Sequence, residues 1–206
     1  MFLKFLGHLF PKVVLKNNLR LSYTFCFGGL AFSAILILAV SGMLLMFYYQ
    51  PHTNLAYESI IFIEETVPGG QFLRNLHRLG SHVFLVLIFL HTLRVILTGA
   101  YRPPRHLNWI VGFALLCLSI FDAYTGYLLP MDQLALWATQ TGMNLLEALP
   151  FGSFASRLLM PDGLGRPLTL LRFYVLHVAA IPLCIVILCQ LHFYQIRKNK
   201  GLLPYL

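Results

Sequence analysis

The run HRLGSHVFLVLIFLH, residues 77–91, is mostly apolar but opens and closes on histidine. It lies inside a longer apolar segment, Arg74–Gly99, and about 20 mainly apolar residues are enough for a helix to cross a bilayer. Because an ionisable ring is costly in hydrocarbon, a membrane helix that carries two histidines is expected to use both. The run therefore predicts a membrane helix with a function at two depths.

Three further segments of the same kind accompany this helix: Phe25–Tyr49, Leu107–Leu129 and Thr169–Gln195. The chain of 206 residues is 58% hydrophobic and 11% charged, with a mean hydropathy of +0.74, which disfavours a soluble bundle of four buried helices. Lipid offers the backbone no hydrogen-bond partner, so the spans are expected to be helices. The sequence predicts one all-α integral membrane domain, residues 1–206, built as a bundle of four transmembrane helices.

Basic residues gather at one end of this predicted bundle. Four spans put both termini and the loop after the second span on one side, where ten of the fifteen basic residues fall: Lys4, Lys12, Lys16, Arg20, Arg94, Arg102, Arg105, Arg197, Lys198 and Lys200. The seven acids fall in the outer half or the outer loops: Glu58, Glu64, Glu65, Asp122, Asp132, Glu147 and Asp162. The positive-inside rule therefore predicts both termini on the cytoplasmic side, and the net charge of +8 indicates topology rather than nucleic-acid binding.

The segments outside the spans give weaker signals. The start, MFLKFLGHLFPKVV, has no signal-peptide cleavage site and predicts an interfacial helix over about residues 1–20. A short surface helix closed by the turn at residues 68–70 is expected after the first span, and one or two helices along the outer membrane face between residues 130 and 167. The four cysteines, at 26, 117, 184 and 189, form no CxxC pair, so neither a disulfide framework nor a zinc site is expected.

The fourth span carries a second histidine pair, His177 and His192, fifteen residues apart against fourteen for His77 and His91. At about 3.6 residues per turn, each pair returns to one face of its helix. Both helices run from outside to inside, so His77 is expected level with His177, and His91 level with His192. Two imidazoles at each depth predict two stacked b haems enclosed by the bundle, one iron at each depth. For a single histidine, a hydrogen bond between helices would be the simpler interpretation.

Glycines repeat with the same period on the other two spans. Gly28 and Gly42 lie on the first span and Gly112 and Gly126 on the third, each pair fourteen residues apart. Helix direction puts Gly28 and Gly112 at the inner depth and the other two at the outer depth. A porphyrin edge needs a helix without a Cβ at its closest approach, which predicts these glycines at the haems; ordinary small-residue packing is the alternative.

Three arginines lie within one turn of a predicted ligand: Arg74, Arg78 and Arg94. Haem propionates are carboxylates, and arginine binds carboxylates in bidentate fashion, so these side chains are expected at the propionates. Snorkelling to the interface is the alternative. The remaining histidines, which lie in terminal or loop positions or off the ligand face, are interpreted as structural: His8, His52, His82 and His106.

Together these features resemble the cytochrome b family of quinol-oxidising bc and bf complexes. The resemblance rests on His77-x13-His91, His177-x14-His192, the fourteen-spaced glycines and the strings HRLGSH, LHTLRVILTGAY, TGYLLP and RFYVLH. The longer spacing in the fourth span, and the end soon after it at IRKNKGLLPYL, resemble the short, split cytochrome b of chloroplast-type bf complexes and their bacterial relatives.

The resemblance implies the electron-transfer subunit of an oxidoreductase complex. A quinol is then oxidised near the outer face, and one electron goes to a Rieske iron–sulfur protein. The other electron passes through the outer and inner haems to a quinone near the cytoplasmic face, with protons released outside and taken up inside. The same resemblance implies a separate three-helix subunit that completes cytochrome b, a cytochrome c-type subunit, a dimeric complex in contact with lipid, and a bacterial inner membrane.

Cys26 lies in FCFGGL, near the inner end of the first span. In the split family a cysteine just before Gly-Gly forms a thioether to an extra haem, so the resemblance implies a third haem, attached covalently through Cys26. A small buried apolar residue is the other interpretation of a cysteine, and the one we give to Cys117, Cys184 and Cys189.

Asp122, in SIFDAYTGYLLP, is a carboxylate inside the third span, one turn before Gly126. Acids inside membranes are functional by default, so Asp122 is predicted to accept a proton from the quinol. A hydrogen bond to a partner subunit is the alternative.

Two features depart from the family pattern. Pro130 is followed by Met131 where the family has tryptophan, and the Pro-Glu motif of the quinol site belongs to a later helix that this sequence lacks. That motif must come from a separate subunit or be missing. The alternative function is a dihaem membrane anchor that links the quinone pool to a different dehydrogenase or reductase without a Rieske partner. A haem-free structural or transport module is the third.

Overall fold

The computed structural model describes residues 25–198, and the interfacial helix predicted for residues 1–20 lies outside this range. Between residues 25 and 198 all regular structure is helical, which confirms the all-α prediction. The elements follow one another as α3 (Phe27–Met46), α4 (Ala56–Glu65), α5 (Gly70–Leu97), α6 (His106–Leu128), α7 (Gln133–Glu147), α8 (Gly152–Leu159), α9 (Pro167–Val175), η2 (Leu176–Ala180) and α10 (Ile181–Lys198).

Four helical stretches are long and apolar enough to cross a membrane: α3, α5, α6 and the continuous run from α9 through η2 to α10. The four predicted spans are therefore confirmed, although their ends shift by a few residues. The second begins at Gly70 rather than at Arg74, because Gly69 turns the chain with a φ of +73°, a conformation that glycine adopts without strain. The first is shorter than predicted and ends at Met46.

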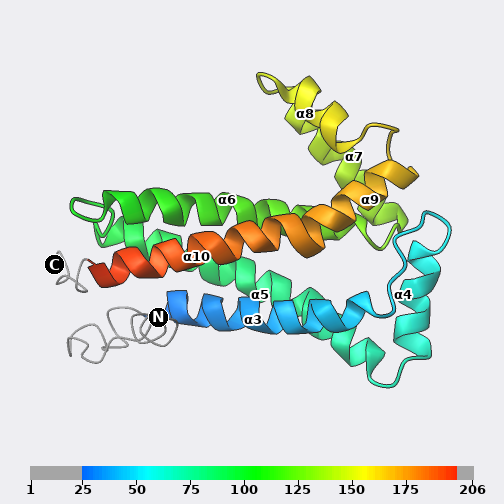
Figure 1. Cartoon of the computed structure of the whole chain (residues 1–206), viewed down its shortest axis with the longest axis horizontal. Helices are drawn as coiled ribbons and strands as arrows, with labels where there is room; N and C mark the ends of the chain where they lie inside the picture. The colour runs from blue at the N-terminus through cyan, green and yellow to red at the C-terminus, as the bar shows by residue number, and fades with distance from the viewer. Residues whose placement is uncertain (1–24, 199–206) are drawn as a thin grey trace, which may run out of the picture.

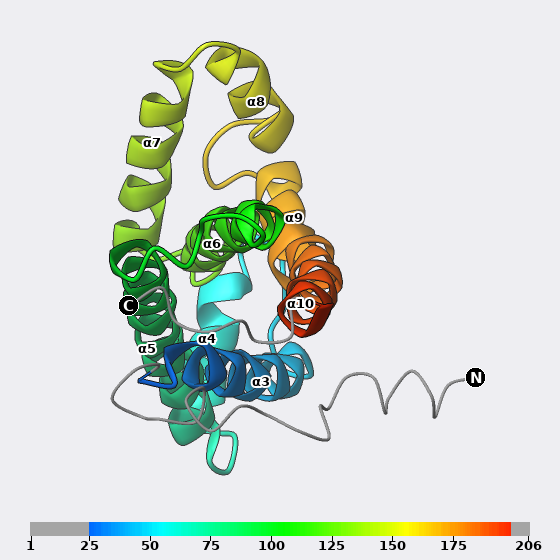
Figure 2. The same ribbon diagram turned by 90° about the vertical axis from the view of Figure 1, so that its left-hand side faces the viewer.

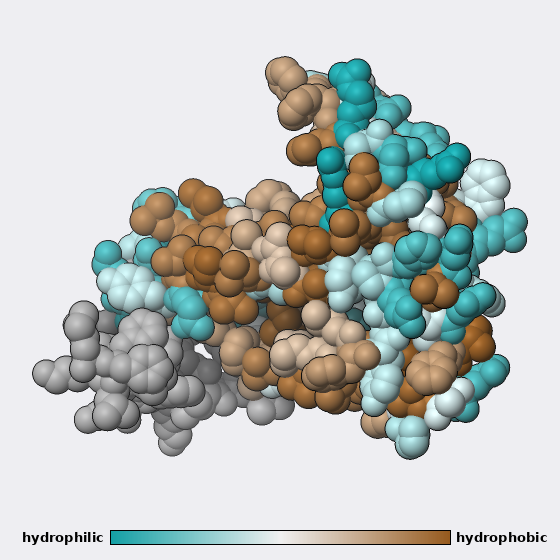
Figure 3. Space-filling model, turned by 45° about the vertical axis from the view of Figure 1, so that its right-hand side comes forward, coloured by the Kyte–Doolittle hydropathy of each residue, from teal (hydrophilic) through white to brown (hydrophobic). Residues whose placement is uncertain are grey.

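The four spans form two packed pairs. Helix α3 packs along α5, and α6 packs along α10, as the view in Figure 2, nearly along the bundle, shows. The pairs meet through contacts of α5 with α6 and through ring pairs such as Phe32 with Phe193, whose centroids lie 5.1 Å apart. Most large apolar side chains on the spans point outward, and apolar surface covers the middle of the bundle between more hydrophilic ends (Figure 3). Contact with lipid suits such a surface, because hydrocarbon does not penalise it.

The helix ends that the sequence predicts on the cytoplasmic side all lie at one end of the bundle (Figure 1). There α3 begins, α5 ends, α6 begins and α10 ends, while α4, α7, α8 and α9 gather at the opposite end. Which of the two ends faces the cytoplasm stays a prediction from the positive-inside rule.

The short helix α4 closes the first outer connection. The turn brings Gly70 against the carbonyl of Ile63, where a Cβ would lie only 1.9 Å from the oxygen, so no other residue fits without a shift of the backbone. Arg74, near the start of α5, forms an ion pair with Glu64 of α4. The predicted surface helix after the first span is thus fixed to the second span at its outer end.

The second outer connection holds two helices, α7 and α8, which project sideways from the bundle (Figure 1). Asp132 caps α7 by accepting a hydrogen bond from the backbone N–H of Ala135 at 2.7 Å. A small core of buried side chains, Leu128, Met143 and Phe173, joins α6, α7 and α9. This core fixes the start of the last span relative to the third.

The last span is not a regular α-helix, because one π-turn, η2, interrupts it around His177. There the backbone N–H of Ile181 donates to the carbonyl of Leu176, five residues back. The next residue, Pro182, has no N–H, and its ring crowds the carbonyl of Val178, four residues earlier. Proline at this place disfavours the regular ladder and gives η2 a local cause.

Candidate functional site

The four predicted ligand histidines come together as two couples. His77 of α5 faces His177 of η2, with ring centroids 6.2 Å apart and ring planes at 88°. His91 of α5 faces His192 of α10, with centroids 6.4 Å apart and planes at 80°. Each couple joins one helix pair of the bundle to the other. The site therefore consists of two imidazole couples, one nearer the outer end of the bundle and one nearer the inner end.

Each ring of the outer couple lies against a glycine of the neighbouring helix. A Cβ added to Gly42 would lie 3.1 Å from Cε1 of His77, and one added to Gly126 would lie 2.5 Å from Cε1 of His177. The second distance is shorter than real Cβ contacts, so the ring of His177 needs glycine on α6.

The inner couple repeats this arrangement. A Cβ added to Gly28 would lie 3.0 Å from Cε1 of His91, and one added to Gly112 would lie 3.2 Å from Cε1 of His192. Within residues 25–198, then, all four glycines make room for an imidazole ring. Their contact with a porphyrin edge stays a prediction.

Hydrogen bonds at Nδ1 set the direction of the outer rings. Ser41 Oγ lies 2.8 Å from the carbonyl oxygen of Ile37 and 2.9 Å from Nδ1 of His77. Since the hydroxyl donates its one proton to the carbonyl, Nδ1–H of His77 donates to Ser41 Oγ. Nδ1–H of His177 donates to the backbone carbonyl of Asp122 at 3.0 Å. Both rings therefore keep the lone pair of Nε2 for a metal.

The spacing of the couples fits one iron between two imidazoles. An imidazole nitrogen binds a first-row metal at about 2 Å, and the ring centre lies about 1 Å beyond it, so two rings on opposite sides of one ion have centroids about 6 Å apart. The observed 6.2 and 6.4 Å agree with that arrangement at both depths. The residues present thus fit a metal that one histidine from each helix pair would hold.

The three predicted propionate ligands lie on α5 at different depths. Arg74 is paired with Glu64, Arg78 is exposed, and Arg94 lies in the last turn of the helix, three residues after His91. None of these positions tests the contact with propionates, which stays a prediction.

The other singled-out residues fall as follows. Cys26 is exposed at the N-terminal end of α3, two residues before Gly28. Asp122 lies on α6 with its carboxylate 3.4 Å from Nδ1 of His177. Met131 packs beside the core of α6, α7 and α9. The exposed side chain of His82 lies off the ligand face.

Two features of the site escape the sequence analysis: the contact of Ser41 with His77, and the π-turn at His177. A serine directly before Gly42, in a mostly apolar helix, is the signal that could have identified the first. Pro182, five residues after His177, is the signal for the second.

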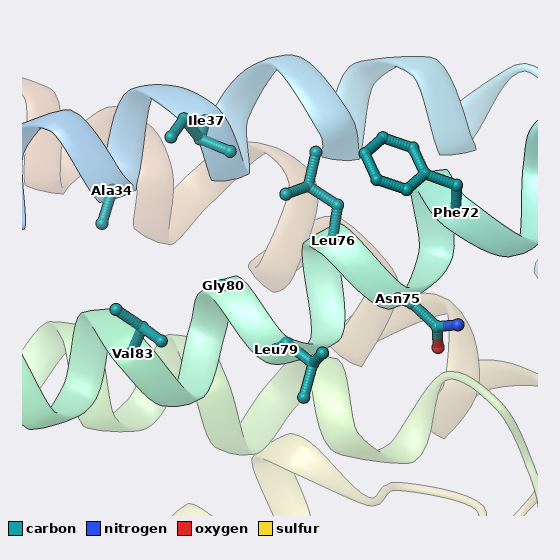
Figure 4. A pocket seen from close by; sticks show the side chains of 8 residues that line it. All are labelled: Ala34, Ile37, Phe72, Asn75, Leu76, Leu79, Gly80 and Val83. Carbon is teal, nitrogen blue, oxygen red and sulfur yellow. The ribbon is translucent and has the colours of Figure 1, made fainter.

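An apolar groove between α3 and α5 is separate from the histidine couples. Figure 4 shows its lining, with two side chains from α3 and six residues from α5: Ala34, Ile37, Phe72, Asn75, Leu76, Leu79, Gly80 and Val83. Several of these are among the most exposed apolar residues of the spans, with Phe72 at 72% and Leu79 at 61%. The groove therefore belongs to the outward surface of the bundle.

Comparison with known proteins identifies the family. The family model described as cytochrome b/b6/petB matches residues 13–200. The menaquinol:cytochrome c reductase cytochrome b subunit of Bacillus subtilis (strain 168) is 40% identical over 195 residues, which cover 93% of this chain and 87% of that protein. Cytochrome b6 of Heliomicrobium gestii is 39% identical over 178 residues, covering 86% of this chain and 84% of that protein.

A solved structure agrees with these relatives. A chain of a hyperthermophilic respiratory complex III superposes with a TM-score of 0.78 at 32% identity, over 87% of this chain. The present chain spans 48% of the length of that solved chain. Four apolar membrane helices and these relatives make it an integral, multi-pass membrane protein. Since the family model covers nearly the whole chain, the protein belongs to the cytochrome b/b6 family, which implies b-type haem.

Proposed function

We propose that this chain is the dihaem cytochrome b subunit of a bc- or bf-type quinol oxidoreductase. It carries electrons from an outer quinol-oxidation site to an inner quinone site, coupled to proton translocation. The observation that carries the proposal is the pair of imidazole couples at two depths, each with the spacing of two axial ligands. The similarity to a menaquinol:cytochrome c reductase subunit favours this function over a dihaem anchor without a Rieske partner.

The chain's own residues hold and orient two cofactors in this proposal. His77 and His177 would hold the outer b haem through Nε2, and His91 with His192 would hold the inner one. When bound, each haem supplies a one-electron iron couple. At the outer depth Ser41 fixes the ring of His77 through Nδ1, so that Nε2 of His77 stays aimed between the helices. The apolar faces of the spans keep water away from both depths.

A third haem, attached through Cys26, belongs to the same proposal. The thiol is exposed at the N-terminal end of α3, and Gly28, one half-turn later, lies against His91. This position near the inner couple supports the attachment of a cofactor there. Arg74, Arg78 and Arg94 remain the candidates for propionate contacts, and the proton role of Asp122 stays a prediction.

The proposed partners follow from the family. A separate three-helix subunit completes cytochrome b and supplies the quinol-site motif, and a Rieske protein and a cytochrome c-type subunit accept electrons. The complex is a dimer in the bacterial inner membrane, with both termini of this chain in the cytoplasm.

Substitution of the histidines tests the dihaem function. In the complex purified from membranes, we expect two non-covalent b haems per wild-type chain, seen in the reduced-minus-oxidised spectrum and counted as pyridine haemochrome. His77→Ala or His177→Ala removes one of them, and His91→Ala or His192→Ala removes the other. His82→Ala, an exposed histidine on the same helix as the first ligand, keeps both. A wild-type complex without b haem, or His77→Ala with both haems intact, contradicts the proposal.

The covalent haem has its own test. After denaturing electrophoresis, peroxidase staining for haem marks the wild-type chain, and Cys26→Ser abolishes the stain. Cys117→Ser and Cys184→Ser are matched controls, because both residues lie on membrane helices and are exposed there, not buried as the sequence interpretation expected. A stain that persists in Cys26→Ser shows that the attachment lies elsewhere.

Subunits that copurify with the chain, identified by mass spectrometry, distinguish a Rieske-type complex from a dihaem anchor.

A further inference from the structure

Helix α6 carries one local pattern twice, fourteen residues apart. At the inner depth Asn108 precedes Gly112 by four residues, and at the outer depth Asp122 precedes Gly126 by the same interval. Each glycine lies against one histidine ring of the η2–α10 run. Residues four apart share a face of a helix, so Asn108 and Asp122 both stand on the face that receives these rings.

Asp122 approaches the ring of His177 with two oxygens. Its backbone carbonyl accepts Nδ1–H at 3.0 Å, and its carboxylate Oδ1 lies 3.4 Å from the same nitrogen. That carboxylate oxygen is buried and has no hydrogen-bond partner. Within residues 25–198, no lysine or arginine lies within ion-pair distance of Asp122. The acidic group is thus aimed at the imidazole of His177.

Asn108 occupies the equivalent place at the inner depth, without an acidic group. Its backbone faces the ring of His192. In the described part of the chain, Nδ1 of His192 makes no hydrogen bond of acceptable geometry, and Oδ1 of Asn108 is buried without a partner. The two depths therefore share the histidine, the glycine and the facing backbone. They differ in carrying a carboxylate at one and a carboxamide at the other.

We infer that Asp122 is a positioning residue that lowers the redox potential of the outer haem through its contact with His177. A carboxylate on the Nδ1–H side of a metal-bound imidazole orients the ring and makes it a stronger donor. A negative charge near the iron also favours the oxidised, more positive form, and burial away from water keeps that attraction effective. The inference rests on the dihaem function proposed above.

Reciprocal substitutions at the two positions test the inference. In the purified complex, a potentiometric titration of the haem absorbance resolves one wave for each b haem. Asp122→Asn, which gives the outer depth the carboxamide of the inner one, should raise the potential of one haem only. We expect a change of at least tenfold in its redox equilibrium, which for one electron is about 59 mV. Asn108→Asp should lower the potential of the other haem, and Asp122→Glu should restore most of the wild-type value.

Glu58→Gln is the matched control, because it removes an acid from the exposed surface of α4, on the same outer end of the chain. Both waves should stay in place in this variant. The inference is overturned if Asp122→Asn retains both haems and both potentials are unchanged. If that variant loads no outer haem, Asn108→Asp decides, and an unmoved inner potential then overturns it. A wild-type complex without haem overturns the proposed function itself, so the two failures are distinguishable.

Discussion

Gly126 is the residue of the site with the least room for change. A Cβ there would lie 2.5 Å from Cε1 of His177, whereas a Cβ at Gly112 would lie 3.2 Å from Cε1 of His192. A neighbouring ring can yield by a few tenths of an ångström but not by a full one. We therefore expect Gly126→Ala to displace His177 and roughly halve the content of b haem, while Gly112→Ala keeps both haems.

The ratio of haem to protein in the purified complex measures this difference, with the reduced-minus-oxidised spectrum to identify what remains. Equal haem loss in the two variants would show that the alanines act through general helix packing and not through the imidazoles.

At this scale the sequence predicts which histidines and glycines share a depth, because helical period and direction decide it. It does not predict the serine contact, which depends on how α3 is rotated against α5. Nor does it predict that the carboxylate of Asp122 faces His177, because these two residues lie on different spans, 55 positions apart in the sequence.

The π-turn explains why unequal histidine spacings give nearly equal ring couples. His177 and His192 are fifteen residues apart and His77 and His91 fourteen, yet the couple distances are 6.2 and 6.4 Å. A π-bulge accommodates one extra residue in a helix, so η2 absorbs the difference. The spacing of the histidines shows the extra residue, and Pro182 is the one sequence signal for the place where the backbone accommodates it.

Deletion of one residue in each span tests this account. Removing Ala179 from η2 should remove the extra residue that the π-turn accommodates and leave both b haems bound. Removing Ile88 from α5 should rotate His91 relative to His77 by about 100° and cost one haem. Haem content and the low-spin ferric spectrum are the measurements. If the first deletion loses haem, or the second retains both haems, then η2 does not absorb the one-residue difference between the two histidine spacings.

The start of the last span depends on Asp162, five residues before the proline that opens α9. Its carboxylate accepts hydrogen bonds from the backbone N–H groups of Leu168 and Thr169 and from the hydroxyl of Thr169. Desolvation alone would raise the pKa of Asp162, but these hydrogen bonds outweigh it and hold the pKa below its ordinary value. Asp162 thus caps the N-terminus of α9, although it lies five residues before Pro167 in the sequence.

A lowered pKa makes this contribution dependent on pH. The folded state favours the ionised form, so Asp162 stabilises the fold above the ordinary carboxyl pKa of about 4, and the contribution is lost as the pH falls through the lower folded value. We expect Asp162→Asn to lower the thermal unfolding temperature near neutral pH and to bring it close to wild type in acid. Unfolding followed by helical circular dichroism in detergent measures both; an equal deficit at all pH values would contradict the account.

For the whole molecule, composition predicts most of the architecture. Lipid requires helices, and the lengths of apolar segments fix how many cross it, which is why four spans could be predicted from residue types alone. The pairing of α3 with α5 and of α6 with α10 could not, because apolar faces in lipid carry little information about which neighbour they contact.

Charge asymmetry predicts the orientation of the molecule, and labelling of introduced cysteines tests it. Asn54 and Arg102 are exposed at opposite ends of the bundle, in the connections before α4 and before α6. We expect an impermeant maleimide to label Asn54→Cys in intact cells and Arg102→Cys only after permeabilisation. The parent chain with its native cysteines provides the background. The reverse pattern would invert the topology.

The division into two helix pairs has a consequence for how the protein is made. Each imidazole couple takes one ring from α5 and the other from the η2–α10 run, so in the proposed complex both b haems would also cross-link the two halves. A newly inserted chain that has not met its haems lacks those cross-links and exposes polar rings to hydrocarbon. Membrane proteases would therefore degrade the haem-free chain more readily than the assembled one. The supply of haem would then limit how many copies are assembled.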